Sequence, residues 1–80
     1  IDSIGWAYYL IDDFIEAEKY LKRAVELMPD DAIVNDHYGD ILWKLGQKIQ
    51  ARYFWKSVLN MKDVDEELLD KINSKIIEGL

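Results

Sequence analysis

Apolar residues recur every three or four positions along the chain, which is the spacing of one face of an α-helix. The pattern predicts five helices, and no segment alternates with the two-residue period of a strand over a useful length. The predicted helices run from the first residues to about Ile11, and then over about Phe14–Met28, Ala32–Leu45, Lys48–Met61 and Glu66–Glu78. An all-α fold is therefore expected.

Short polar segments separate these helices and carry the usual stop and start signals. The pair Asp12-Asp13 is expected to end the first helix, because Asp tolerates the left-handed backbone conformation found there. Pro29 should stop the second helix, and Gly46 should follow the third. Asp31 and Asp65 are expected to cap the third and fifth helices. Connections of three or four residues force successive helices to lie antiparallel.

The apolar pattern also repeats at a fixed offset of 34 residues. The equivalent pairs are Gly5 with Gly39, Ala17 with Ala51, Leu21 with Trp55, and Ala24 with Val58. An offset that preserves small and large apolar positions indicates a repeated supersecondary unit, because each position keeps its packing role. We expect Ala17 to pack against Gly5 and Tyr8, and the second unit to pack in the same way.

The two units resemble the tetratricopeptide repeat, a helix–turn–helix of 34 residues. The first unit reads Ile4-Gly5-x2-Tyr8 and then Ala17-x3-Leu21-x2-Ala24-x4-Pro29; the second reads Tyr38-Gly39-x2-Leu42 and then Ala51-x3-Trp55-x2-Val58-x4-Asp63. The chain departs from the family pattern at the early Trp, which is Ile1 and Asn35 here, and at the second closing Pro, which is Asp63. More loosely, the chain is similar to the last repeats of long bacterial proteins of this family.

The resemblance implies a right-handed α-solenoid of antiparallel helix pairs. Residues 1–31 would be a first repeat that lacks its first residues, residues 32–65 a second repeat, and residues 66–80 a C-terminal capping helix. Such a cap needs a polar outer face. The residues expected to form it are Asp65, Glu66, Glu67, Asp70, Lys71, Lys75 and Glu78. The chain opens at Ile1 inside an apolar pattern, so we expect it to be part of a longer protein.

Composition narrows the classes of partner. The formal net charge of −6 argues against nucleic acid and anionic membranes, because both bind proteins that neutralise negative charge. There is no cysteine, His37 is the only histidine, and no glycine-rich phosphate loop is present, so an enzyme is not expected. Asp36, His37 and Asp40 could hold a metal ion, but a solvated face or a polar binding edge is favoured without a second His or a Cys. No cofactor is expected, and the compartment is not indicated.

The candidate binding site follows from the resemblance, because the first helix of each tetratricopeptide repeat lines a concave groove. The implied groove residues are Asp2, Trp6 and Tyr9 in the first unit, with Leu10 beside them, and Asp36, His37, Asp40, Trp43 and Lys44 in the second, with Ile33. The family's two-carboxylate clamp places Lys, Asn or Arg at positions that here hold Asp2, Trp6 and His37. A carboxylate-tail ligand is therefore disfavoured, whereas an acidic groove with aromatic anchors suits a basic or apolar peptide.

Three alternatives stay open beside this interaction module. Trp6 could instead pack against a preceding repeat, and the whole chain could be only the structural end of a longer array. The exposed face of the first repeat could also mediate self-association. A basic stripe on the fourth helix, formed by Lys48, Arg52 and Lys56, is expected to balance the acidic first turn of the last helix. In the adjacent run Tyr53-Phe54-Trp55, we expect Trp55 in the core, Phe54 near the last helix and Tyr53 at the surface.

Overall fold

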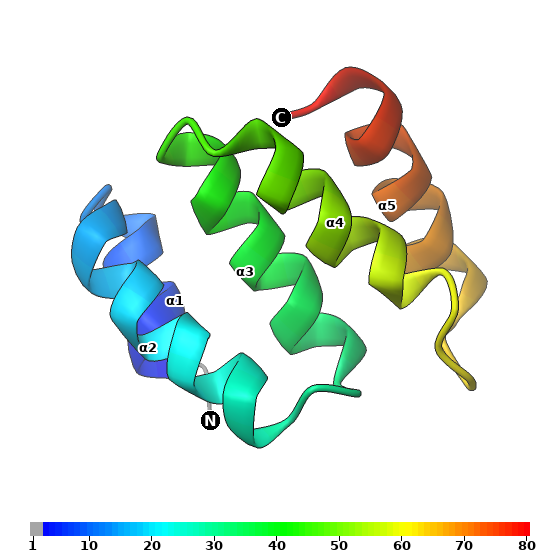
Figure 1. Ribbon diagram of the computed structural model, residues 1–80, viewed down its shortest axis with the longest axis horizontal. Coiled ribbons are helices and arrows are strands. Elements are labelled where there is room, and N and C mark those ends of the chain that lie inside the picture. Colours follow the sequence, from blue (N-terminus) through cyan, green and yellow to red (C-terminus); the bar gives the residue numbers. More distant parts are fainter. Residues whose placement is uncertain (1–2) are drawn as a thin grey trace.

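The computed structural model describes residues 3–80, which form five helices and no strand (Figure 1). The helices are α1 (Ser3–Leu10), α2 (Phe14–Leu27), α3 (Ala32–Lys44), α4 (Lys48–Val58) and α5 (Glu66–Glu78). α1 and α2 form one helical hairpin, α3 and α4 form the next, and α5 packs against α4 at the far end. The expected all-α helical-repeat fold is confirmed. The exact limits of the two repeats and the cap stay predictions.

Local capping chemistry accounts for most helix ends. The Asp31 carboxylate accepts a hydrogen bond from the Val34 amide at 3.0 Å, and Asp65 accepts one from the Leu68 amide at 2.8 Å, as expected of N-caps. Asp12 and Gly46 adopt φ values of 63° and 85°, so both predicted left-handed residues are confirmed.

Each hairpin closes around a glycine on its first helix. A Cβ atom built on Gly5 would overlap the Leu21 side chain and would lie 3.5 Å from the carbonyl oxygen of Ala17. A Cβ atom built on Gly39 would overlap the indole ring of Trp55, which is fully buried. The equivalent glycines therefore let the two helices of each hairpin approach closely, as the 34-residue offset predicts.

The core lies on both sides of α3, which contributes more buried residues than any other helix. The buried apolar residues are Ala17, Leu21 and Ala24 of α2, Val34, Tyr38, Ile41 and Leu42 of α3, Ala51, Trp55 and Val58 of α4, and Ile72 of α5. α3 is enclosed because α2 packs on one side of it and α4 on the other. This central helix also carries most of the predicted binding residues.

Three predicted features differ in the structure. Ile4 and Ile11 are 58% and 71% exposed, because no described element covers their face of α1. The apolar spacing would place Leu27 on the buried face of α2 with Ala17, Leu21 and Ala24. Leu27 is nevertheless 67% exposed, because it is rotated by about 60° or more from these three residues. α4 ends at Val58 and not near Met61, because the next three amides bond to carbonyls three residues back.

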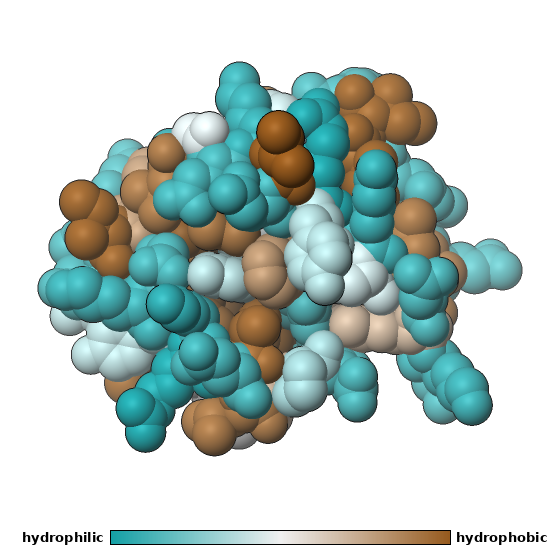
Figure 2. Space-filling view, viewed as in Figure 1, coloured by the Kyte–Doolittle hydropathy of each residue, from teal (hydrophilic) through white to brown (hydrophobic). Residues whose placement is uncertain are grey.

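The surface is mixed in character. In the face shown by Figure 2, apolar side chains (brown) stand between polar ones (teal), without one continuous apolar sheet. Tyr53 is 67% exposed, which confirms the expectation for this residue, and its neighbour Trp55 is in the core. None of the described helices is long and apolar enough to cross a membrane.

Candidate functional site

An aromatic stack joins the two hairpins. Trp6 and Tyr9 lie on the face of α1 that points away from Ile4 and Ile11, because each is two residues from one of these isoleucines and two residues turn a helix by about 200°. The Trp6 ring stacks on Tyr9 with centroids 4.3 Å apart and on His37 of α3 with centroids 3.8 Å apart. All three side chains are half-buried. We call this set of three residues the α1–α3 surface.

Negative charge surrounds the tyrosine of this surface. Burial raises the pKa of Tyr9 above its ordinary value, and the nearby carboxylate of Asp40 raises it further, with smaller contributions from Asp12 and Asp36. Lys75 opposes this effect and lowers the pKa of Tyr9. Among the charged neighbours, Asp40 affects this pKa more than Lys75 does, so the carboxylates together outweigh the single amine at the Tyr9 hydroxyl. The Tyr9 hydroxyl therefore lies in a net negative field.

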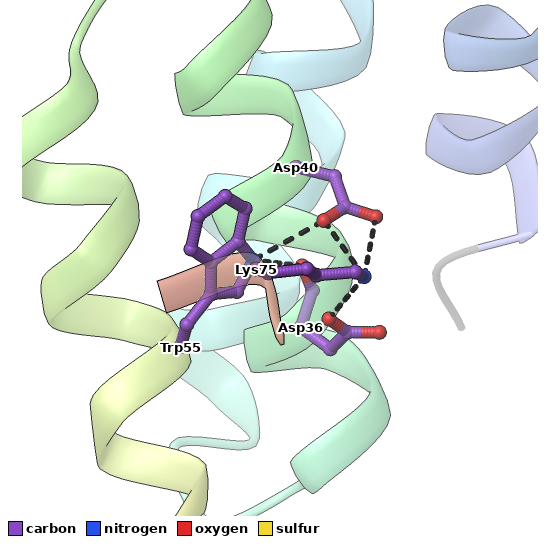
Figure 3. Close-up of polar contacts among 4 residues, drawn as sticks. All are labelled: Asp36, Asp40, Trp55 and Lys75. Atoms are coloured by element: carbon purple, nitrogen blue, oxygen red, sulfur yellow. Dashed lines mark hydrogen bonds and ion pairs between the residues drawn. The ribbon is translucent and has the colours of Figure 1, made fainter. Parts of the chain in front are cut away.

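Asp36 and Asp40 do not line an open groove. They lie one turn apart on α3 and are only 6% and 5% exposed. The Lys75 ammonium of α5 reaches between them and donates hydrogen bonds to Asp36 Oδ1 at 2.7 Å and to the two oxygens of Asp40 at 3.0 and 3.2 Å (Figure 3). Trp55 Nε1 donates to Asp40 Oδ1 at 3.1 Å and to the carbonyl of Asp36 at 3.2 Å. Lys75 therefore does not lie on the polar outer face of α5, where the sequence predicts it.

The charges of this buried group depend on each other. Burial raises the pKa of Asp40, and the charge of Asp36 raises it further, whereas Lys75 lowers it. Burial lowers the pKa of Lys75, but its bonds and charge interactions with Asp36 and Asp40 outweigh burial and raise that pKa overall. The ammonium is therefore held in its charged form by the two carboxylates.

Trp43 is also covered by the C-terminal region. A Cβ atom built on Gly79 would overlap the Trp43 indole, and the C-terminus lies beside the start of α4 in Figure 1. The Lys48 ammonium and the Arg52 guanidinium lie 4.9 and 4.8 Å from the centre of an indole ring of Trp43. Trp43 therefore packs inside the molecule more than it faces a groove, and Lys44 beside it is exposed.

The basic stripe on α4 does not pair as the sequence predicts. Arg52 Nε donates to the carbonyl oxygen of Ile76 at 2.9 Å, which is near the end of α5 and not at its acidic first turn. Lys48 lies on Trp43, and Lys56 is exposed. The ring contacts of Phe54 are with Tyr38 and Tyr53. The stripe therefore helps to hold α4, α5 and Trp43 together through stacking and one backbone bond.

The structure divides the predicted site residues into two groups. Trp6, Tyr9 and His37 come together on the α1–α3 surface, whereas Asp36, Asp40 and Trp43 lie beneath α5 and the chain end. Asp2 lies outside the described residues. Sequence reasoning missed Lys75 as a partner of the acidic pair. The available signal was its position three residues after Ile72 and next to Ile76, on the inward side of an amphipathic helix.

Two further features bear on the chemistry. Within residues 3–80, no group of three or more His, Cys, Asp or Glu side chains is placed to hold a metal ion. A shallow apolar hollow of about 440 Å³ lies on the opposite face of α1 from the aromatic stack. It is lined by Ser3, Ile4, Ala7, Tyr8 and Ile11.

One comparison with known proteins gives a match. A family model described as tetratricopeptide repeat matches residues 2–31, which cover α1 and α2 with their connecting turn. No curated protein and no solved structure matches the chain. Repeats of this family generally mediate contacts between proteins.

Proposed function

The chain belongs to the tetratricopeptide repeat family, and from that premise we propose that it binds a peptide segment of a partner protein on the α1–α3 surface. The observation that carries the proposal is the half-buried stack of Trp6, Tyr9 and His37, which comes from two different hairpins. Aromatic side chains that are already ordered by stacking offer large contact area at a low entropic cost. No catalytic role is part of the proposal.

The chemistry of this surface favours a basic or apolar segment. The stacked rings offer apolar contact area, and the carboxylates near Tyr9 add a negative field that attracts an ammonium or guanidinium group. Lys75 neutralises part of the charge of Asp36 and Asp40, so these two residues act on a partner through this field. On α3, the exposed Ile33 and Lys44 extend the surface beyond the stack.

The net charge of −6 supports a protein partner over nucleic acid or an anionic membrane. The same negative charge would speed the encounter with a basic segment at low salt. Binding to the α1–α3 surface should therefore weaken as the salt concentration rises, and an uncharged apolar peptide should show a smaller dependence.

A second candidate function is structural. The exposed apolar face of α1, with Ile4 and Ile11, is the kind of surface that a further repeat or a second copy of the chain would cover, and α5 closes the opposite end. In that case these residues would terminate and stabilise a longer array, and the binding surface would lie elsewhere. A test of whether this chain binds peptides by itself distinguishes the two functions.

The experiment is a titration of the protein with a library of short peptides that mix Arg, Lys and aromatic residues, followed by fluorescence anisotropy of a labelled peptide. Trp6→Ala should weaken binding on the order of tenfold, because it removes the ring that contacts both Tyr9 and His37. Tyr53→Ala is the matched control, since it removes an exposed aromatic ring of α4.

Equal affinities for the parent protein, Trp6→Ala and Tyr53→Ala would contradict the proposed surface. The helical content of each variant is measured by circular dichroism, so that loss of fold is not mistaken for loss of contact. If no peptide of the library binds the parent protein, the structural function is favoured.

A further inference from the structure

α5 is held to the rest of the molecule by apolar packing, by the bond from Arg52 to the carbonyl of Ile76, and by Lys75. Its apolar packing is against α4, with Ile72 fully buried and Leu68 and Ile76 partly buried against the core. Its ion pairs with α3 are made by a single side chain, Lys75. Ile77 on the outer side of the helix is 77% exposed. Because only one residue of α5 is fully buried, few buried apolar contacts are lost when the helix opens. The free energy of this local opening is therefore small.

The connection that precedes α5 is the longest in the described chain. Three residues join α1 to α2 and α3 to α4, and four residues join α2 to α3, whereas the seven residues 59–65 join α4 to α5. Asp63 in this segment has a φ of 60°, and the segment contains no helix. Residues 59–61 are bonded back to α4, and the remaining four residues can span roughly 13 Å when extended, so α5 can move away from α3 without unwinding α4.

Lys75 makes the closed position of α5 electrostatically favourable. Without its ammonium, α5 would cover two buried carboxylates that lie one helical turn apart and repel each other. The bonds of 2.7, 3.0 and 3.2 Å satisfy both carboxylates with one amine. The raised pKa of Lys75 agrees with an ammonium that is stabilised in the closed position. Lys75 is therefore the side chain that links the closed position of α5 to the charges of α3.

The covered face is the second half of the predicted binding surface. α5 and the residues after it lie over Asp36, Asp40 and Trp43, which occupy the positions equivalent by the 34-residue offset to Asp2, Trp6 and Tyr9. When α5 leaves, this acidic and aromatic face becomes continuous with the α1–α3 surface through His37 of the same helix. A basic peptide would then meet carboxylates directly instead of through a screened field.

We propose that α5 is a lid that opens as a unit from α3 and α4, that Lys75 is its lock, and that the closed lid limits peptide binding. The last part of this inference rests on the proposed function. The opening of the lid does not, because it is a property of the free protein. A peptide that binds only the open form has its apparent affinity reduced by the fraction of molecules that are open.

The test compares Lys75→Gln with Lys71→Gln, which removes one positive charge from an exposed side chain on the same helix. Amide hydrogen exchange is followed by NMR for α5, at residues such as Ile72 and Ile76, and for α3, at Ile41 and Leu42. The proposal predicts that the amides of α5 exchange faster than those of α3 in the parent protein. Lys75→Gln should accelerate exchange in α5 by about tenfold or more and leave α3 less affected, and Lys71→Gln should change neither.

Peptide affinity supplies the second measurement. Lys75→Gln should bind the basic peptide several-fold more tightly than Lys71→Gln, because more molecules have an open lid. Exchange that is equal in α5 and α3, and accelerated equally by Lys75→Gln, would overturn the lid. Faster exchange of α5 with no gain in affinity over Lys71→Gln would overturn its role in limiting binding. If the parent protein and both variants bind no peptide, the proposed function fails, and the exchange data alone decide whether α5 is a lid.

Discussion

The two hairpins use the same repeat positions in different surroundings. Tyr38 of the second hairpin is 7% exposed, whereas Ile4, its equivalent at an offset of 34 residues, is 58% exposed. Both occupy the same face of the first helix of their hairpin. The difference arises because α2 covers this face of α3, and no described element covers it on α1. The repeat therefore fixes which face is apolar, and the neighbouring helix decides whether that face becomes core.

The opposite faces of the same two helices show a second contrast. On α1, Trp6 and Tyr9 stack with His37 and stay half-exposed. On α3, the equivalent residues are Asp40 and Trp43, and both are covered by α5 or by the residues after it. The first hairpin thus offers an aromatic surface to solvent, while the second keeps an acidic one beneath a helix.

The largest expected effect is a difference in stability between substitutions on the covered apolar face of α3 and on the uncovered apolar face of α1. Tyr38→Ala should lower the free energy of unfolding by about 3–5 kcal/mol, because it removes a buried ring and its 2.9 Å hydrogen bond to Glu18. Ile4→Ala should change it by less than about 0.5 kcal/mol, since Ile4 is mainly exposed. Urea unfolding followed by circular dichroism measures both. Similar losses for the two variants would mean that α1 is covered in solution.

A smaller difference is expected between the two glycines. Gly39→Leu should cost about 1–3 kcal/mol, because the new side chain meets the rigid, fully buried indole of Trp55. Gly5→Leu should cost less, since it meets the more flexible Leu21 at the end of the array. Ala7→Leu, at an exposed position of α1, is the control and should be nearly neutral. A Gly39→Leu variant with an unchanged melting temperature would contradict the packing role that the 34-residue alignment gives to Gly39.

The smallest expected effect is a loss of stability at alkaline pH. The folded-state pKa of Lys75 is raised above 10.5, so its contribution is fully present below that pH and is lost as pH rises through the raised value. The pKa values of Tyr9 and Tyr38 are also raised, chiefly by burial, so above about pH 10 the unfolded chain holds fewer protons than the folded protein. Stability should therefore fall as pH rises.

A pair of variants isolates the contribution of the lysine. Lys75→Met should show a shallower decline of melting temperature between about pH 10 and pH 12 than the parent protein, because one of the three titrating groups is gone. Lys71→Met should decline as the parent does, because Lys71 is exposed on the same helix. Parallel curves for all three proteins would mean that Lys75 is not held by the acidic pair in solution.

The sequence was sufficient for the elements that depend on local chemistry. The caps by Asp31 and Asp65 and the left-handed residues Asp12 and Gly46 follow from the residue type and its neighbours, and the structure has them all. The 34-residue offset also located both close approaches at Gly5 and Gly39. These features need no knowledge of distant parts of the chain.

The candidate site could be predicted only in part, because its surroundings are set by distant residues. The bond between Lys75 and Asp36 joins positions 39 residues apart, and it depends on the orientation of α5 on α4. Periodicity could place Lys75 on the inward side of the last helix, but it could not say which residues of α3 would lie opposite Lys75. The sequence therefore predicts Asp36 and Asp40 on an open groove, but the structure pairs both with Lys75 beneath α5. The aromatic half of the predicted groove does come together, with Trp6 stacked on His37.

The central claim is that partners contact the α1–α3 surface, and chemical-shift mapping tests it most directly. The labelled protein is titrated with a basic, aromatic peptide while the indole signal of Trp6 and the signals of Tyr9 and His37 are followed. The account predicts that the largest changes occur at these residues and decrease with added salt. Changes confined to the outer side of α4, around Lys48 and Tyr53, would contradict it.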